Sequence, residues 1–373
     1  MKMLKGRRII FVLGNLELGG AERQALILAR SLSQHEQAHV EVWGFNKSGT
    51  VAEICDQIGL PWRVIPYSFA NSRFGALLRV ARSLRQAKPD ILLPYTFVPN
   101  LVCGLIWKRT GAHACVWNQR DEGLVPFASP AIKKAVNKTS HFISNSEAGA
   151  RFLIDKLGAS EDKVSVIPNG VETVAAQEDR QTWRERLAVD DRAFVACMVA
   201  NLHLNKDHAT VLRAWRRVVD EFGSNGRSAL LVLAGRHDGA YESLASLASE
   251  LQINDHVRFA GPVSDVRGLL SAANVSVFSS RSEGCPNAVL ESMAAGLPVA
   301  GSDIKGIRDV VGSGGSQFLA PVGDADAFAK VLLELAKNPE LCVHAGAANR
   351  ERVVNNYDSL RMCRETAKLL AQL

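Results

Sequence analysis

The chain has 373 residues and a mass of 40.4 kDa, which is the size of two ordinary domains rather than one. Hydrophobic residues make up 47% of it and charged residues 22%, a balance that excludes a disordered, fibrous or disulfide-stapled chain. Positive charge is concentrated in the first half. Residues 1–175 contain 22 Lys and Arg against 14 Asp and Glu, a net of +8, whereas the remainder contains 22 against 24, a net of −2.

Cysteine usage and hydropathy indicate a cytoplasmic protein. The seven cysteines are scattered and form no CxxC pair, which favours buried free thiols over disulfides or a zinc site. The N-terminal apolar run, 9–13, is shorter than the roughly 7 to 15 residues of a signal peptide. The longest uncharged run, 91–107, contains two prolines and an asparagine, so we expect a strand, a turn and a helix there and no membrane span.

Short apolar runs alternate with helical patterns along the chain. In the first half, the expected strands are 9–13, 40–43, 91–93, 141–145 and 163–167, with a helix over 21–33. In the second half, the expected strands are 194–200, 229–234, 257–259 and 275–278, with helices over 209–219 and 288–295. This alternation predicts an α/β fold with two tandem doubly wound, Rossmann-like domains.

The domain boundaries follow from the same pattern. We place the first domain at residues 1–175 and the second at 176–358, and interpret the charged, apolar-poor stretch 169–191 as a linker. The last helical pattern, within 359–373, could pack back on the first domain. Parallel sheets bind ligands beyond the carboxyl ends of their strands, so a cleft between the domains is the expected site.

A basic amphipathic pattern lies in the first half. Its charged members are Arg73, Arg79, Arg82, Arg85 and Lys88. Such a helix could lie on an anionic membrane surface, and the alternative is an ordinary solvated surface helix. We expect no nucleic-acid partner, because no recognition-helix or aromatic-interleaved signature accompanies the charge.

The most informative stretch is 279–303, SSRSEGCPNAVLESMAAGLPVAGSD. It follows an expected strand, so Glu283 would lie in the loop at that strand's carboxyl end. A helix beginning near Asn287 would offer its N-terminal N–H groups to a phosphate. Glu291, eight residues after Glu283, would come about one turn inside this helix and could hold a ribose. The spacing alone is also compatible with a loop acid and a surface helix acid, but the whole context favours a ligand site.

EGCPNAVLE, followed by SMAAGLPVA and SD, resembles the signature of glycosyltransferase family 4, whose members are retaining enzymes with the GT-B fold. The resemblance covers most of the chain. Its further segments are LELGGAERQALILARSL, ISNSEAGARFLIDKLGASEDKVSVIPNGVE, VANLHLNKDHATVLRAW, LVLAGRHDG and FAGPVSDVRGLLSAANVSVFSSRSEG. It implies a GT-B fold with an interdomain cleft, an acceptor-binding first domain and a nucleotide-sugar-binding second domain.

The resemblance also implies residue roles. Lys206 would pair with the donor diphosphate, where negative charge develops on the leaving group, although a solvated lysine is the alternative. Glu283 would hydrogen-bond to sugar hydroxyls and Glu291 would hold the ribose. The remaining donor-binding residues would act through their backbones: Gly19, Gly20, Gly284, Cys285, Pro286 and Asn287.

The chain departs from the family pattern at two places. Members commonly carry an arginine five residues before the lysine, and here that position is Asn201, with His203 nearby and Arg236 after the next strand. Asn201 and Arg236 are therefore candidate donor-binding residues. Some members carry a histidine at a strand end of the first domain, where this chain offers Arg120 and Asp121. Arg120 would contact phosphate or acceptor, or would form a structural salt bridge.

The resemblance implies a metal-independent, retaining hexosyl or other glycosyltransferase without a cofactor. It would use a UDP- or GDP-sugar and a lipid-linked or polysaccharide acceptor, as in bacterial-type surface glycan or lipopolysaccharide synthesis. Asp324 and Asp326 mimic a metal motif, but they open a helical pattern, so Asp324 or Asp326 is interpreted as its N-cap. We expect a cytoplasmic protein, peripheral on the inner face of the membrane. The alternatives are a non-catalytic sugar-nucleotide-binding partner subunit and a GT-B sugar-nucleotide epimerase.

Overall fold

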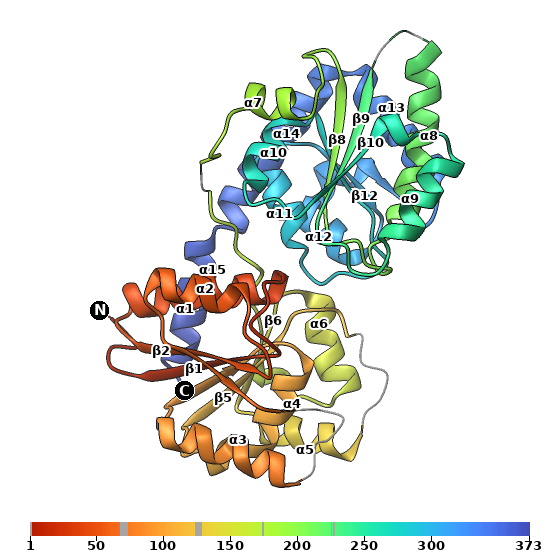
Figure 1. Ribbon diagram of the computed structural model, residues 1–373. Coiled ribbons are helices and arrows are strands. Elements are labelled where there is room, and N and C mark those ends of the chain that lie inside the picture. Colours follow the sequence, from red (N-terminus) through yellow and green to blue (C-terminus); the bar gives the residue numbers. More distant parts are fainter. Residues whose placement is uncertain (1, 68–73, 124–128, 174, 225, 227) are drawn as a thin grey trace. The chain divides into compact units, whose positions relative to one another are not determined.

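The computed structural model of the protein describes residues 2–67, 74–123, 129–173, 175–224, 226 and 228–373 (Figure 1). The chain divides into two compact units. The first consists of Met1–Gly170 together with Ser359–Leu373, and the second of Val171–Asp358.

The first unit is built on a sheet that has seven parallel strands among the described residues, in the order β3-β2-β1-β4-β5-β6-β7. The strands are β1 (Arg8–Leu13), β2 (His39–Phe45), β3 (Trp62–Ile65), β4 (Ile91–Pro94), β5 (Ala114–Gln119), β6 (His141–Ser144) and β7 (Val164–Val166). In the register of the central strands, Phe11 lies opposite Val42 on one side and Leu93 on the other. The uninterrupted apolar sequence of β1 is that of a strand covered on both faces.

Helices cover both faces of this sheet (Figure 1). They are α1 (Gly20–Gln34), α2 (Thr50–Ile58), α3 (Phe74–Ala87), α4 (Phe97–Ile106), α5 (Pro130–Lys138), α6 (Glu147–Arg151) and α15 (Ser359–Leu370). Side chains of α1, α2 and α15 share one apolar core with β1, whereas α3 and α4 pack against the opposite face. Met362, Cys363 and Leu370 are buried, so the C-terminal helix is part of the first unit's core.

Most of the described apolar side of α3 packs in the core on that opposite face. Val80, Ala81 and Leu84 are buried, whereas Arg79, Arg82 and Arg85 are exposed. Arg73, which the sequence places on the same amphipathic pattern, lies outside the described residues. Binding of a membrane by α3 would therefore rely mainly on its charged side, together with Leu78, which is 41% exposed beside Arg79.

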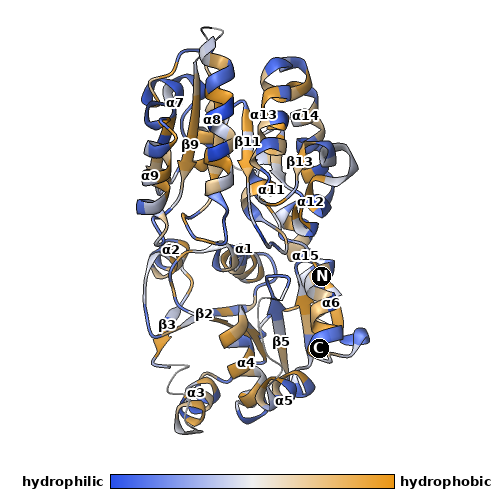
Figure 2. Cartoon of the chain, turned by 90° about the vertical axis from the view of Figure 1, so that its right-hand side faces the viewer, coloured by the Kyte–Doolittle hydropathy of each residue, from blue (hydrophilic) through white to orange (hydrophobic). Residues whose placement is uncertain are grey.

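The second unit repeats the doubly wound plan. Its six described strands are parallel and follow the order β10-β9-β8-β11-β12-β13. They are β8 (Phe194–Val199), β9 (Ala229–Ala234), β10 (Val257–Gly261), β11 (Val275–Phe278), β12 (Val299–Ser302) and β13 (Leu319–Ala320). The strands β9 and β11 are largely hydrophobic, as expected for a sheet covered on both faces (Figure 2).

Two groups of helices cover the second sheet. α8 (His208–Ser224), α9 (Tyr241–Glu250) and α13 (Ala325–Lys337) share one core. The opposite face carries α7 (Arg180–Arg186), α10 (Val266–Ala272), α11 (Asn287–Ala294), α12 (Lys305–Gly315) and α14 (Pro339–Asn356). Asp324 caps α13, since its Oδ1 accepts hydrogen bonds from the N–H groups of Asp326 and Ala327, as its sequence context predicted.

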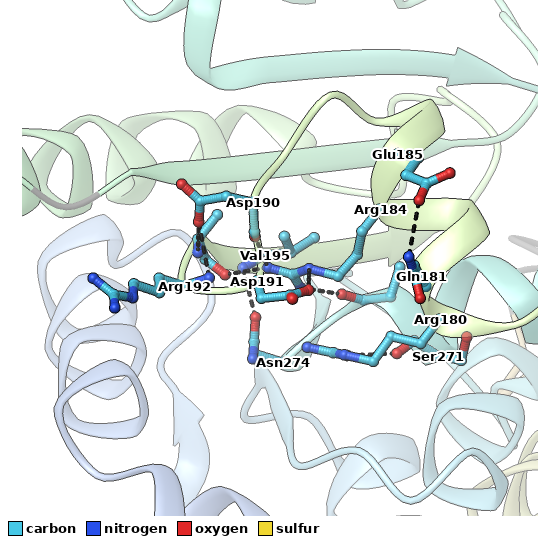
Figure 3. A network of polar contacts seen from close by, with 12 residues as sticks. Arg180, Gln181, Arg184, Glu185, Asp190, Asp191, Arg192, Val195, Ser271 and Asn274 are labelled. Atoms are coloured by element: carbon cyan, nitrogen blue, oxygen red, sulfur yellow. Dashed lines mark hydrogen bonds and ion pairs between the residues drawn. The ribbon is translucent and has the colours of Figure 1, made fainter.

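The interpretation of residues 169–191 as a linker is wrong for most of their length, because they contain α7, which is fastened to the second unit (Figure 3). Buried Arg184 donates to the carbonyl oxygens of Ala272, Asp190 and Ala193 at 2.6–2.7 Å. Arg180 donates to the carbonyl of Ser271 at 2.6 Å. Two arginines of this stretch therefore bind backbone carbonyls of the second unit. The described residues contain no helix long and apolar enough to cross a membrane.

Candidate functional site

The strand order of the second sheet indicates where a ligand would bind. From β8 the chain proceeds through β9 and β10 toward one edge, and then returns to place β11 on the other side of β8. The loops that follow β8 and β11 leave the sheet side by side but continue to opposite edges. In doubly wound sheets, ligands bind at such a switch point. The loops after β8 and β11 carry Lys206 and Glu283, respectively.

These two side chains form an ion pair in the structure. Lys206 Nζ donates to Glu283 Oε1, and it also lies 4.9 Å from the centre of the Phe278 ring. The same carboxylate oxygen accepts a hydrogen bond of 2.8 Å from Ser280 Oγ. The side chains of Lys206 and Glu283 remain 28% and 14% exposed. The pair is therefore partly shielded from water but still within reach of a ligand.

A histidine fixes the backbone that carries Lys206. His208 is the first residue of α8 and is buried, and both its backbone N and its Nδ1 contact the carbonyl oxygen of Lys206. Because a carbonyl oxygen can only accept, Nδ1 carries the proton of the neutral ring. Burial lowers the pKa of His208 to about 4, with smaller and opposing effects from its neighbours. The ring therefore stays neutral at physiological pH.

The loop after β11 packs closely against α12. A Cβ atom at Gly306, the second residue of α12, would lie 2.0 Å from the carbonyl oxygen of Glu283 and 2.7 Å from that of Gly284. Gly306 thus permits a backbone approach that no other residue allows. The following residues, Cys285 and Pro286, are buried and lead into α11, which begins at Asn287. The structure thus gathers Glu283, Gly284, Cys285, Pro286 and Asn287 between a strand end and a helix N-terminus, as the sequence predicted.

At the position where family members commonly carry an arginine, this chain has Asn201, and its side chain makes a structural hydrogen bond. Its Oδ1 accepts a hydrogen bond of 3.1 Å from the backbone N of Arg236, which follows β9. Leu202 N donates to the carbonyl of Arg236 at 2.8 Å, so the loops after β8 and β9 are joined. The Arg236 side chain is partly exposed and lies 3.5 Å from Asp238. The contact of Asn201 is thus with the backbone of Arg236, whose guanidinium group pairs with Asp238.

The other predicted residues lie in three places. Glu291 is in the middle of α11 and is half-buried. In the first unit, Gly19 precedes α1 as its N-cap and Gly20 is its first residue. Arg120 follows β5 and donates to Asn169 Oδ1 at 2.5 Å, and its guanidinium lies 5.3 Å from the Tyr95 ring centre.

Asp121 is engaged within its own turn. Its Oδ1 accepts hydrogen bonds from Gln119 Nε2 at 2.7 Å and Gly123 N at 2.8 Å. The contacts of Arg120 thus join it to Asn169 and Tyr95, while those of Asp121 shape the loop. The donor-binding roles expected for Gly19 and Gly20, and the phosphate or acceptor role expected for Arg120, stay predictions.

Sequence reasoning missed three residues of the site: Ser280, His208 and Gly306. Ser280 lies three residues before Glu283 and is the second residue after a buried strand, a position that could have drawn attention to it. His208 follows Lys206 by two residues at a helix start, where a side chain can turn back onto the preceding backbone. The role of Gly306 depends on a tertiary contact and has no local signal.

Two family models match the chain. The model described as Glycosyltransferase Family 4 matches residues 18–174, and the one described as Glycosyl transferases group 1 matches residues 179–352. Together they cover most of both units.

Curated relatives are similar over about half of their length. A Bacillus subtilis (strain 168) protein named as glycosyltransferase EpsD is 33% identical over 192 residues, which are 51% of this chain and 49% of that protein. The D-inositol 3-phosphate glycosyltransferase of Streptomyces scabiei (strain 87.22) is 30% identical over 221 residues, 57% of this chain and 50% of that protein. The chain thus spans about half the length of the curated relatives it matches.

Solved structures match over nearly the whole chain. Anabaena HepE in complex with UDP-glucose has a TM-score of 0.85 at 19% identity, covering 98% of this chain and 100% of that chain. WaaG, a glycosyltransferase involved in lipopolysaccharide biosynthesis, has a TM-score of 0.75 at 15% identity, covering 97% and 99%. Two doubly wound parallel sheets of seven and six described strands match the GT-B fold of these structures. The chain belongs to the glycosyltransferases of family 4, group 1.

Proposed function

We propose that the protein is a retaining glycosyltransferase that moves a sugar from a nucleoside diphosphate sugar to a lipid-linked or polysaccharide acceptor. The observation that carries this proposal is the Lys206–Glu283 ion pair at the switch point of the second sheet. It places a cation, for a leaving diphosphate, beside a carboxylate, for sugar hydroxyls. The N-terminus of α11 follows at once, with N–H groups that favour a phosphate.

Lys206 would stabilise the negative charge that develops on the departing diphosphate, the step for which a fixed positive charge is most effective. Glu283 would accept hydrogen bonds from sugar hydroxyls rather than attack the sugar. Its carboxylate already accepts from Lys206 and Ser280, and donors that stabilise a carboxylate reduce its strength as a nucleophile. We therefore favour attack by the acceptor on the face from which the diphosphate leaves, which retains the anomeric configuration.

We favour UDP as the nucleotide, because the structurally similar HepE was solved with UDP and with UDP-glucose. A glycan or lipid-linked acceptor, bound by the first unit in surface glycan synthesis, is supported by the likeness to WaaG. We also propose that the reaction needs no metal. Asp324 caps α13, and Asp326 pairs with Arg217, so these two carboxylates have structural partners. Activity that survives EDTA would agree with this.

A ligand panel followed by a turnover assay tests the proposal. UDP, GDP, ADP and their sugars are compared by thermal shift, since a ligand at 100 times its Kd stabilises a protein by about 2.7 kcal/mol. The best sugar nucleotide is then incubated with a bacterial lipid extract, and the product linkage is determined by NMR. We expect stabilisation by UDP and an α-linked product from an α-linked donor.

Other outcomes would contradict the proposal in distinguishable ways. Binding of a sugar nucleotide without turnover on any acceptor would indicate a non-catalytic partner subunit. Conversion of the sugar nucleotide without an acceptor would indicate an epimerase. An inverted linkage would overturn retention alone.

A further inference from the structure

Ser280 has no role in the proposed reaction, yet its side chain contacts Glu283 of the proposed site. It is completely buried, and its Oγ lies 2.8 Å from Glu283 Oε1. The carbonyl oxygens of Asn205 and Ser282 are each 3.3 Å away. A hydroxyl has one proton to donate, and the carboxylate is both the nearest and the only charged acceptor of these three. The hydroxyl of Ser280 therefore donates to Glu283.

The backbone around Ser280 is held on two sides. Its N–H donates to Ser302 Oγ at 3.1 Å, at the end of the neighbouring strand β12. The next residue, Arg281, donates its N–H to the carbonyl of Asn205 at 3.2 Å, in the loop that carries Lys206. Ser280 is thus a fixed donor between the loops after β8 and β11.

Lys206 cannot neutralise Glu283 and a donor diphosphate equally well at the same time. A diphosphate carries more negative charge than a carboxylate, so it would draw the ammonium group away. Glu283 would then keep the hydrogen bond from Ser280, whose buried hydroxyl has no access to water.

We propose that Ser280 is the positioning residue of Glu283, holding the carboxylate toward the sugar hydroxyls when Lys206 turns to the diphosphate. The inference rests on the proposed function and adds to it a side chain that acts without touching the donor.

The measured quantity is the gain in affinity that the sugar provides, expressed as the Kd for UDP divided by the Kd for a UDP-sugar. The probes are UDP, UDP-glucose, UDP-galactose and UDP-N-acetylglucosamine, compared by calorimetry, and the tightest sugar is used throughout. We expect Ser280→Ala to reduce this ratio about tenfold, the scale of a lost hydrogen bond to a charged group. The Kd for UDP should stay within about twofold, because Ser280 acts on the sugar contact alone.

A neighbouring serine offers a matched control. Ser276 lies on β11, the strand that precedes Ser280, is 2% exposed and makes a hydrogen bond of 2.7 Å to Ser292. Ser276→Ala removes the same atom from a comparable environment and should leave the ratio unchanged. Ser280→Cys, which keeps the volume but donates weakly, should give an intermediate ratio, and it replaces Ser280→Ala if that variant does not fold.

A second background tests whether Ser280 acts through Glu283. In Glu283→Ala, the further change Ser280→Ala should have no effect on the ratio, since the group that it positions is gone. The inference is overturned if Ser280→Ala behaves like Ser276→Ala, if the Kd for UDP rises as much as that for the UDP-sugar, or if the two changes add. Wild-type protein that binds no nucleotide, or gains nothing from any sugar, would instead refute the proposed function, and the inference with it.

Discussion

The ammonium group of Lys206 is the cation that the loop after β8 brings to Glu283. If it stabilises the leaving diphosphate, we expect Lys206→Ala to lower kcat by about 100-fold or more, the scale seen when one charge-stabilising donor is removed. Lys305→Ala is the control, because Lys305 is an exposed lysine of the same unit that pairs with Asp309. Near-normal kcat in Lys206→Ala would move the charge-stabilising role to Arg236 or His203.

Glu283 also neutralises Lys206 while no donor is bound. Glu283→Gln removes this negative charge, so the lysine would be available to UDP without first breaking an ion pair. We expect UDP to bind about fivefold more tightly to Glu283→Gln, since a partly exposed ion pair is worth about 1 kcal/mol. Calorimetry with UDP measures the change. The affinity of Lys206→Ala/Glu283→Gln for UDP should equal that of Lys206→Ala. Tighter binding by the double variant than by Lys206→Ala would show that the gain does not come from Lys206.

The buried, neutral ring of His208 makes stability depend on pH. Its pKa is about 4 in the folded protein, compared with about 6.5 in an unfolded chain, so below pH 6.5 the unfolded state binds a proton that the folded state does not. Stability from this group is therefore complete above pH 6.5 and is lost as the pH falls toward 4. Between pH 7.5 and 4.5 we expect a loss of about 2–3 kcal/mol from this source.

Urea unfolding of the wild type and of His208→Asn measures that loss. Asparagine can still donate to the Lys206 carbonyl but does not titrate, so the variant's free energy of unfolding should fall less on acidification. If the free energy of unfolding fell equally with pH in the two proteins, His208 would be excluded as the source of the loss.

Among the secondary-structure elements, α12 controls the position of the loop after β11. Gly306→Ala would bring a Cβ to 2.0 Å from the Glu283 carbonyl oxygen, so either the loop or the helix must move. We expect a loss of about 1–3 kcal/mol in the free energy of unfolding, together with weaker binding of UDP-sugars. Gly314→Ala, in the same helix, meets no atom within 4 Å and should be neutral or slightly stabilising. Equal stability of both variants would show that the contact is easily relieved.

The helices and strands with strong apolar patterns could be predicted from the sequence, but some elements could not. The strands β1, β8, β9 and β11 and the helix α1 lie within one residue of their predicted ranges, because buried strands and amphipathic helices carry strong apolar patterns, whereas α8 continues five residues past its predicted end. The edge strand β3 is short and half-exposed, and its sequence WRVI carries little of that signal. β5 ends in Asn118 and Gln119, residues with low strand propensity. Asn118 is nevertheless buried there, because its side chain donates to the Pro94 carbonyl and its backbone N–H to Asn100 Oδ1.

The candidate site shows the same division between local and tertiary information. The positions of Glu283 and Asn287, after a strand and at a helix start, follow from the local pattern. That Lys206 pairs with Glu283 does not, because 77 residues separate them and only the strand order brings β8 beside β11. For α7, the charged sequence concealed one buried arginine, Arg184, that binds carbonyl groups across the fold.

Over the molecule as a whole, the excess positive charge lies in residues 1–175, and part of it gathers on one basic surface of the first unit. This basic surface comprises the exposed residues Arg79, Arg82, Arg85, Lys108, Arg109 and Lys134. α3 packs against the turn that carries Lys108 and Arg109. Burial, together with Lys134, Arg109 and Lys108, lowers the pKa of nearby Lys138, which indicates that these charges act on one another.

We expect this basic surface to hold the protein on anionic membranes mainly by charge, because most of the described apolar side of α3 is packed in the core and Leu78 is the large hydrophobic residue that it leaves exposed. Each Lys or Arg near such a surface contributes about 1 kcal/mol, and the attraction is screened over about 8 Å at physiological ionic strength. Three or four engaged side chains would give an attachment that is useful but sensitive to salt. It would also keep a lipid-linked acceptor near the unit proposed to bind it.

Co-sedimentation with phosphatidylglycerol vesicles at low and high salt measures this attachment. Binding at low salt should be lost at high salt and in Arg79→Glu/Arg82→Glu/Arg85→Glu. The control Arg213→Glu/Arg258→Glu/Arg350→Glu changes the net charge equally at exposed positions of the second unit, and it should still bind. Equal loss in both triple variants would make net charge, rather than the basic surface, the cause. Binding that resists salt would indicate an apolar contact with the bilayer, such as one made by the exposed Leu78, in place of attachment by charge.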